Sequence, residues 1–260
     1  MSRRYDHRTT TFSPEGRLFQ TEYAMEAINH SGAAVGILVR DGIVLLGVQH
    51  TTNQLLEPSE EKMFKINEKT ACAVAGLNSD AINLIDYARR VSLQHMMKFD
   101  ESMPLEQLIS IVCDLKQSYT QLGGLRPYGV SFIIGGWDEH YGFQLYLTQP
   151  SGMYGAWKAT AIGMNSKTSQ VCLRQDYKET MSIEEATVLG LKAIAKSLDT
   201  ANVTAEKLEI VQITRDAHRR KEEQIIQKVL TKDEITALIE ANKDVIVRRD
   251  EDEEEEGGEY

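Results

Sequence analysis

The stretch FSPEGRLFQTEYAMEAI, residues 12–28, combines a tight turn with the start of an amphipathic helix. Pro14 fixes its backbone φ angle, and Gly16 allows the chain to reverse direction. From Leu18 onward, apolar residues recur at helical spacing, at Phe19, Tyr23, Ala24, Ala27 and Ile28. The pattern predicts a turn followed by a helix over residues 18–29, before any strand has formed. That order is unusual for an enzyme core and favours a docking element.

The next segment predicts an antiparallel hairpin, because two apolar, β-leaning runs over 33–39 and 43–48 are joined through Asp41-Gly42. Further strands are expected over 70–75, 131–135, 143–147, 157–163 and 208–214. A first long helix is expected over 81–97, with an N-cap at Asn78, Ser79 or Asp80, and a second from Pro104 to Gly123. A third helix is expected from Asn165 or Ser166 to Tyr177. Capping boxes at Ser182 and Thr231 predict two more, of which the first extends to about Ser197.

Strands and helices come in blocks rather than in strict alternation, which argues against a parallel doubly wound sheet. Helices packed outside stacked antiparallel sheets fit this order better. No internal repeat or interdomain linker is evident, so residues 1–240 are expected to form one domain. Residues 250–256 are all acidic, and the segment 241–260 is expected to be a charged, disordered tail. A solubilising role for this tail is favoured over binding of a specific partner.

The composition is that of an ordinary soluble globular protein, with 42% hydrophobic and 26% charged residues. The formal net charge of −10 argues against a general nucleic-acid binder. No apolar run is long enough to cross a bilayer, and the basic first residues precede no apolar segment, so no secretory signal is expected. The cysteines are isolated in the sequence, at Cys72, Cys113 and Cys172. They predict reduced thiols in the core and a location in the cytoplasm or nucleus.

Familiar catalytic and ligand-binding motifs are missing from the sequence. There is no phosphate-binding glycine loop and no nucleophile elbow, and the histidines never fall at ligand spacing. Neither a cofactor nor a metal is therefore expected. Proteolysis could expose Thr9, Thr10 or Thr11, but these are expected to be ordinary residues of an extended tail. A role in binding RNA or a scaffold rests only on the short basic cluster 218–221, which is more typical of an exposed turn.

Tyr5-Asp6 followed by residues 12–23 closely resembles the N-terminal signature of proteasome alpha subunits, and Arg126-Pro127-Tyr128-Gly129 resembles a second segment of that class. The resemblance covers about residues 2–240. It implies the N-terminal-nucleophile hydrolase fold, an α+β four-layer αββα sandwich with two stacked antiparallel sheets between helix layers. Further segments resemble one subtype of the family, among them 113–117, 136–138, 140–146 and 157–160.

The resemblance also allows a test for catalysis. Catalytic relatives use an N-terminal threonine whose α-amine activates its own hydroxyl, supported by an aspartate and a lysine. Alignment of the hairpin places Gly32 at the threonine and Val48 at the aspartate, whereas Lys62 falls near the lysine. The resemblance therefore implies a non-catalytic subunit of a threonine-type endopeptidase complex. The alternative, an autonomous N-terminal-nucleophile amidohydrolase, requires processing to a threonine or serine.

The resemblance further implies partners. In this family, seven different alpha subunits form an outer ring that stacks on the beta subunits of the inner rings, and N-terminal tails close an axial pore. The tail of this chain is expected over residues 1–12. The regulatory particle or other activators dock on the ring and open it for ubiquitin-dependent and ubiquitin-independent protein degradation. No membrane and no specific nucleic acid are expected as partners.

Five residues match the family's functional positions. Tyr5, Asp6, Pro14 and Tyr23 match the cluster that holds the gate open when an activator binds, and Lys62 matches the lysine that pairs with an activator's C-terminal carboxylate in a pocket between alpha subunits. The plainer alternatives are helix packing for Tyr23 and a solvated surface lysine for Lys62. One departure from the pattern is His7, which replaces an arginine that many alpha subunits carry after Tyr-Asp.

Overall fold

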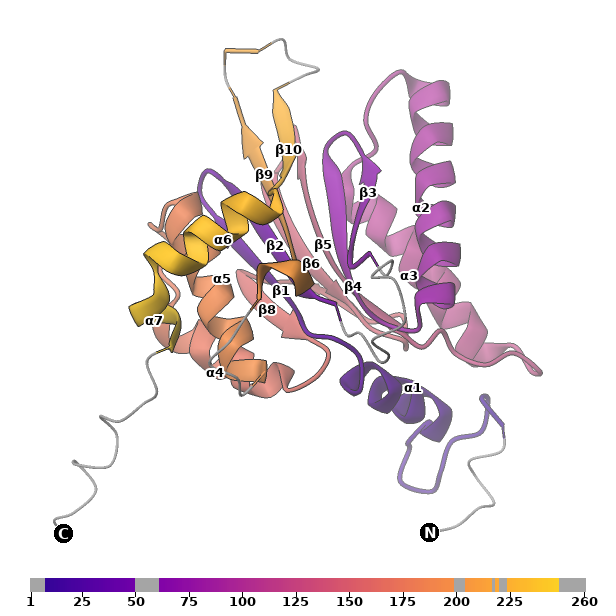
Figure 1. The fold of residues 1–260 in the computed structure, drawn as a ribbon. Helices are drawn as coiled ribbons and strands as arrows, with labels where there is room; N and C mark the ends of the chain where they lie inside the picture. Colours follow the sequence, from indigo (N-terminus) through magenta and orange to yellow (C-terminus); the bar gives the residue numbers. More distant parts are fainter. Residues whose placement is uncertain (1–7, 50–60, 199–203, 217, 220–223, 248–260) are drawn as a thin grey trace, which may run out of the picture.

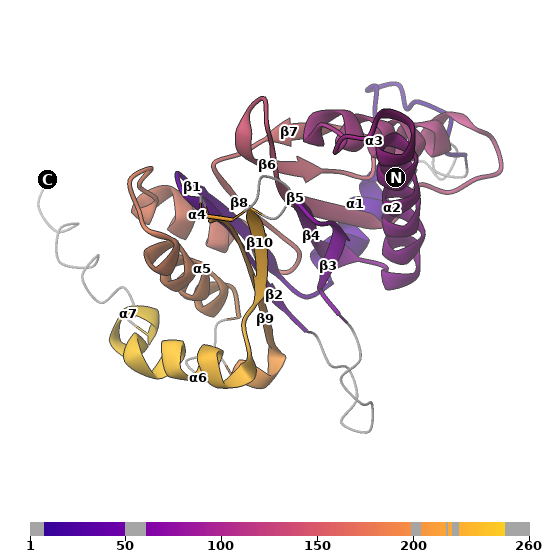
Figure 2. The same ribbon diagram turned by 90° about the horizontal axis from the view of Figure 1, so that it is seen from above.

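The computed structural model describes residues 8–49, 61–198, 204–216, 218–219 and 224–247. Two five-stranded sheets lie face to face in the middle of the molecule, and helices cover both outer faces (Figures 1 and 2). All strand pairs within these sheets are antiparallel. The fold is thus the expected four-layer αββα sandwich.

The first sheet has the strand order β10-β9-β2-β1-β8. Its strands are β1 (Ala34–Val39), β2 (Gly42–Val48), β8 (Ala159–Ile162), β9 (Leu208–Arg215) and β10 (Ile225–Val229). The second sheet has the order β3-β4-β5-β6-β7. Its strands are β3 (Met63–Asn67), β4 (Thr70–Gly76), β5 (Val130–Asp138), β6 (Gly142–Thr148) and β7 (Tyr154–Ala156).

The helices divide between the two sheets. Over the second sheet lie α2 (Asn78–Phe99) and α3 (Leu105–Gln121), and over the first lie α4 (Ser166–Asp176), α5 (Ile183–Leu198), α6 (Lys232–Ala241) and the short α7 (Lys243–Val247) (Figure 2). A 3-10 turn, η1 (Ala205–Lys207), leads into β9. The remaining helix, α1 (Phe19–Asn29), lies at one end of the sandwich, far from the β9–β10 hairpin (Figure 1).

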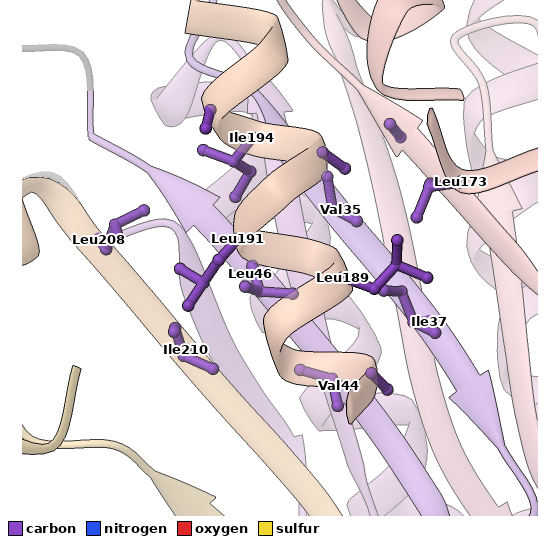
Figure 3. Close-up of a cluster of buried hydrophobic side chains, with 14 of the residues drawn as sticks. Val35, Ile37, Val44, Leu46, Leu173, Leu189, Leu191, Ile194, Leu208 and Ile210 are labelled. Atoms are coloured by element: carbon purple, nitrogen blue, oxygen red, sulfur yellow. The ribbon is translucent and has the colours of Figure 1, made fainter. Parts of the chain in front are cut away.

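The core consists of three apolar layers, and the alternation of side chains along each strand produces them. On β1, Val35 and Ile37 face the helices, whereas Ala34 faces the other sheet. The helix-facing residues pack against Leu189, Leu191 and Ile194 of α5 (Figure 3). Because β1 and β2 are covered on both faces, their residues are apolar in nearly continuous runs rather than in alternation.

The elements with strong local signals agree with the sequence. Residue Val39 of β1 pairs with Gly42 of β2, which confirms the hairpin around Asp41. Both capping boxes are present. At the first, the backbone N–H of Glu185 donates to Ser182 Oγ at 3.2 Å, and the Ser182 N–H donates to the Glu185 carboxylate at 2.9 Å. The second, at Thr231, begins α6 in the same way.

The predicted N-cap of α2 is wrong, and Asn165 holds the predicted N-cap of α4 without a side-chain capping bond. The N-cap of α2 is Leu77, which makes no side-chain capping bond, and Asp80 lies within the first turn with its carboxylate bound to another loop. At α4, Asn165 adopts a left-handed conformation with φ of 51° and no capping bond. Its side-chain amide instead donates to the carbonyl of Ser197 at 2.7 Å. In both cases a tertiary hydrogen bond competes successfully with the local one.

The strand predicted from Trp157 begins later, at Ala159, and the sequence patterns miss β3, β7, β10 and α7. The missed strands are short, and they lie at or near sheet edges with few fully buried residues. In addition, α7 lies inside the range expected to be a tail, and it buries Ile246 against the first sheet's helices. The acidic run 250–256 lies outside the described residues.

None of the helices in the described part of the chain combines the length and apolar character that crossing a membrane requires. The three cysteines are buried and none of them forms a disulfide, as the sequence predicts. Burial raises the pKa of the Cys72 thiol to about 12 and that of Cys113 to about 11, so both are neutral thiols at physiological pH.

Candidate gate and activator-docking site

The turn before α1 is held by its own hydrogen bonds. The N–H of Ser13 donates to the carbonyl of Arg17 at 2.9 Å, and the N–H of Gly16 donates to the carbonyl of Ser13 at 2.9 Å. Gly16 has a φ of +76°, the left-handed conformation that a glycine permits at a reversal. Pro14 is exposed in this turn. The turn is therefore a compact unit with the proline on its surface.

Side chains join this turn to α1. Arg17 Nε donates to the Glu22 carboxylate at 2.7 Å, and the Arg17 guanidinium lies 5.4 Å from the centre of the Phe19 ring. The hydrogen bond from Arg17 lowers the pKa of Glu22. Phe19 in turn stacks on Tyr23, with ring centres 6.4 Å apart. The turn and the first part of α1 thus form one connected surface.

Of the expected gate cluster, the structure describes Pro14 and Tyr23, whereas Tyr5 and Asp6 lie outside the described residues, as does His7. Tyr23 is 51% exposed, so its ring does not pack in the core of its own chain. Only Ile28 of α1 is buried, and it inserts between the two sheets. Tyr23 contacts Phe19 of the same helix and exposes the rest of its ring, so the position is compatible with helix packing as well as with the gate cluster.

A loop beside the N-terminal segment is fixed by an ion pair that the sequence did not reveal. Arg126 donates to both carboxylate oxygens of Asp80, at 2.6 and 2.8 Å, and the N–H of Gly129 donates to the same carboxylate at 2.9 Å. Burial opposes ionisation of Asp80, but these hydrogen bonds outweigh it and lower the pKa of the carboxyl group. Asp80 therefore anchors the Arg126-to-Gly129 segment to the start of α2.

Between this loop and the N-terminal segment lies a cavity of about 520 Å³, lined by Arg8, Thr9, Thr10, Gln20 and residues 123–126. Thr9 and Thr10 lie in a turn rather than in the extended tail that the sequence predicts. The threonines are thus placed on the α1 side of the molecule and are not at the start of β1.

Lys62 is not a solvated surface lysine, since only 6% of it is exposed. A Cβ atom placed on Gly32 would lie 3.3 Å from Lys62 Nζ and would collide with the carbonyl oxygen of Val48. The structure therefore brings together the three positions that align with the catalytic threonine, aspartate and lysine. Here they are Gly32, Val48 and Lys62, so the place of the nucleophile holds no side chain and the place of the acid holds an apolar one.

The collision with Val48 extends this conclusion. Any side chain at position 32 requires the backbone of β1 or β2 to move, since the two strands are fixed by the ladder that pairs Ala34 with Gly47. A threonine in place of Gly32 therefore does not restore a catalytic geometry. The site retains the lysine of a hydrolase without the means of nucleophilic attack.

Two stacked antiparallel sheets, with a buried lysine beside the start of the first strand, define the N-terminal-nucleophile hydrolase class, here without its nucleophile. A family profile described as "Proteasome subunit" matches residues 28–213. A second profile, which describes the N-terminal signature of A-type proteasome subunits, matches residues 5–27. Together they cover the turn, α1 and most of the sandwich.

Individual proteins that are similar to this chain carry the name of the same family. The chain is 55% identical to the alpha type-4 proteasome subunit of Spinacia oleracea over 215 residues, which is 82% of this chain and 86% of the relative. It is 54% identical to the alpha type-4-A proteasome subunit of Arabidopsis thaliana over the same shares. It is 51% identical to the probable alpha type-3 proteasome subunit of Schizosaccharomyces pombe over 92% of this chain and 96% of that protein.

The chain therefore belongs to the proteasome alpha-subunit family and is a non-catalytic alpha-ring subunit of the 20S proteasome. The segments that resembled one subtype, such as 113–117, agree with the type-4 names of the first two relatives.

Proposed function

We propose that this chain fills one position in a ring of seven different alpha subunits that stacks on the inner beta rings of a threonine-type endopeptidase complex. The observation that carries the proposal is the Gly32 site: a hydrolase fold in which the nucleophile is missing and its side-chain space is closed by Val48. A chain that keeps such a fold at 55% identity to alpha-type relatives, without its chemistry, serves by assembly rather than by catalysis.

We propose that residues 1–12 contribute to closing an axial pore, and that Tyr5, Asp6, Pro14 and Tyr23 form the cluster that holds the open state. Support comes from the exposure of Pro14 and Tyr23 on the connected surface of the turn and α1. A tyrosine hydroxyl that donates to an aspartate forms a charge-assisted hydrogen bond, which can select one of two tail conformations.

Lys62 is proposed as the cation that pairs with the C-terminal carboxylate of an activator, such as a regulatory particle. Its side chain is almost entirely buried in the single chain, so the proposal requires that the ammonium group becomes accessible in a pocket between this chain and a neighbouring subunit. We further propose that the protein works in the cytoplasm and nucleus, in ubiquitin-dependent and ubiquitin-independent protein degradation. The three buried cysteines form no disulfide, which is consistent with such reducing compartments.

The autonomous amidohydrolase alternative receives no support from the shape of the molecule. A cavity of about 970 Å³ opens beside the β1–β2 turn, between Arg40, Trp137 and Tyr177. It lies at the opposite end of β1 from Gly32, so it cannot present a substrate to a nucleophile at that position.

Native mass spectrometry of the chain, purified gently from its own cells through a C-terminal tag, tests the proposal. We expect recovery in a very large particle with many distinct subunits, and an unprocessed N-terminal segment in the intact mass. Recovery as a monomer or small homo-oligomer, with a mass that shows a new N-terminal threonine or serine, would reject the ring assignment in favour of the hydrolase.

A further inference from the structure

Lys62 lies in a slot that two glycines leave open. A Cβ atom placed on Gly47 would lie 2.9 Å from Lys62 Cβ and 3.5 Å from Cγ, whereas one placed on Gly32 would lie 3.2 Å from Cε and 3.3 Å from Nζ. The aliphatic stem therefore crosses β2 at Gly47 and ends beside Gly32. A side chain at either glycine would displace it.

The backbone of Lys62 is held from both sides. Its carbonyl accepts a hydrogen bond from the N–H of Val74 on β4, at 3.0 Å, which extends the ladder of the second sheet. Its N–H donates to Glu209 Oε2 at 2.8 Å, and the N–H of Met63 donates to the same oxygen at 3.0 Å. The other carboxylate oxygen, Oε1, accepts from the side-chain amide of Gln49 at 2.5 Å.

Glu209 joins parts of the chain that are far apart in sequence. It lies on β9 of the first sheet, paired in register with Gly47, whereas Met63 begins β3 of the second sheet. Its carboxylate thus ties the end of β2, through Gln49, to the start of β3 across the gap between the sheets. One carboxylate oxygen satisfies the consecutive backbone N–H groups of Lys62 and Met63.

We propose that Glu209 is the positioning residue for Lys62: it fixes the backbone from which the lysine enters its glycine-bordered slot, and so holds the ammonium group where an activator's carboxylate is to be bound. The structural part of this inference stands alone, whereas its consequence for activators rests on the proposed function of Lys62. Three donors on one carboxylate give a well-defined backbone position, and preorganisation of a binding group lowers the entropic cost of binding.

The substitution Glu209→Gln tests the positioning. It keeps the size of the side chain but removes its charge, so the two charge-assisted bonds from the backbone N–H groups of Lys62 and Met63 become weaker neutral ones, and Gln49 must reverse its amide to keep its own bond. We expect Lys62 in the full-length chain to be acetylated about tenfold faster by sulfo-N-hydroxysuccinimidyl acetate. The reason is that loss of a hydrogen bond to a charged group shifts the equilibrium between the held and the released lysine by about a factor of ten. Peptide mass spectrometry measures the rate at Lys62 relative to the exposed Lys167.

Two further variants make the test specific. Glu68→Gln removes the same charge from the exposed β3–β4 turn, where Glu68 pairs with Lys65, and it is expected to leave the rate at Lys62 unchanged. Gln49→Ala removes one donor and leaves both backbone bonds, so a smaller increase is expected. Equal rates at Lys62 in the wild-type, Glu209→Gln and Gln49→Ala chains would overturn the inference, whether or not Lys62 binds activators.

A second measurement tests whether the position of Lys62 matters for the binding of an activator's C-terminal carboxylate. The probe is an octapeptide with the C-terminal sequence of a regulatory-particle subunit, made as the free acid and as the C-terminal amide, and its affinity for the assembled particle is measured by fluorescence anisotropy. We expect Glu209→Gln to weaken the free acid about tenfold and to leave the amide unchanged. If Lys62 becomes more reactive while acid and amide bind equally well to the wild-type particle, the positioning stands and the carboxylate pocket at Lys62 is rejected.

Discussion

At the scale of single residues, the least expected feature of the core is Lys116 on α3, which has no exposed surface. Its Nζ donates to the carbonyl of Val130 at 3.0 Å and to Thr148 Oγ1 at 2.9 Å, and it lies 4.9 Å from the centre of the Phe132 ring. Burial lowers the pKa of Lys116 to about 7. The amine therefore joins α3 to β5 and β6 as a hydrogen-bond donor, and its contribution to the free energy of unfolding depends on pH.

The first prediction concerns this pH dependence. Lys116 has an ordinary pKa of 10.5 when unfolded and about 7 in the fold, so between these values the unfolded chain binds a proton that the native chain does not. The free energy of unfolding should therefore rise with pH over this interval, by up to about 1.4 kcal/mol per unit. In Lys116→Met this contribution is absent.

Urea unfolding of the isolated chain at several values between pH 7 and 10 measures the slope, and the exposed Lys167→Met variant serves as the control. The wild-type and Lys167→Met chains should share one slope, and Lys116→Met should show a smaller one. Identical slopes in all three chains would mean that Lys116 is charged inside the fold.

At the scale of elements, the sequence predicts well where the signal is local. The hairpin around Asp41 and the capping boxes at Ser182 and Thr231 are each contained in a few neighbouring residues, and all are present. Edge strands such as β10 are missed because they bury little and so carry no strong apolar period.

In the candidate site, too, the sequence predicts the local features and misses those that depend on distant residues. Alignment of the hairpin is sufficient to place Lys62 near Gly32, and the structure confirms this. The environment of Lys62 is not predicted, because the residue that binds its backbone N–H, Glu209, is 147 residues away in the chain. The ion pair of Asp80 is not predicted either, because its partner Arg126 is 46 residues away. From the neighbouring residues alone, Asp80 is best interpreted as a helix cap.

The second prediction concerns the box that begins α6. The N–H of Glu234 donates to Thr231 Oγ1, and the N–H of Thr231 donates to the Glu234 carboxylate at 2.9 Å. Thr231→Ala removes the first of these and should destabilise α6 by about 1 kcal/mol. Because Ile235 on this helix is fully buried against the first sheet's core, the loss should also reach the whole fold.

Amide hydrogen exchange across residues 232–241 measures the effect, with Thr236→Ala as the matched control in the same helix. Thr236 is exposed, and its hydroxyl donates to the carbonyl of Lys232 within the helix, so its replacement should be nearly neutral. Equal exchange in both variants would show that the cap contributes nothing to α6.

At the scale of the whole molecule, the residues proposed to act lie apart from the helix layers. Pro14 and Tyr23 belong to the turn and α1, and α1 lies against β4 and β5 at one end of the sandwich (Figure 1). Gly32 is the third residue after the end of α1, and Lys62 lies beside Gly32. One end of the sandwich thus carries the former catalytic position, the candidate carboxylate-binding lysine and the surface next to the tail, while the two helix layers remain as structural faces.

The last prediction tests the tail through this arrangement. Deletion of residues 2–12 ends just before Ser13, whose hydrogen bonds to Gly16 and Arg17 close the turn independently of the tail, so α1 and the sandwich should fold and assemble. If the tail helps to close an axial pore, the assembled particle should hydrolyse short fluorogenic peptides several-fold faster without an activator, and stimulation by an activator should shrink in proportion. Deletion of residues 249–260 removes a segment of similar length from the other terminus and should change neither rate. Unchanged basal hydrolysis in a fully assembled particle would mean that this subunit is not a principal gate-former. The same result is expected if His7 cannot make the contacts of the arginine that it replaces. A basal rate that is lower in the full-length His7→Arg particle than in the wild-type and deletion particles would then identify His7 as the cause.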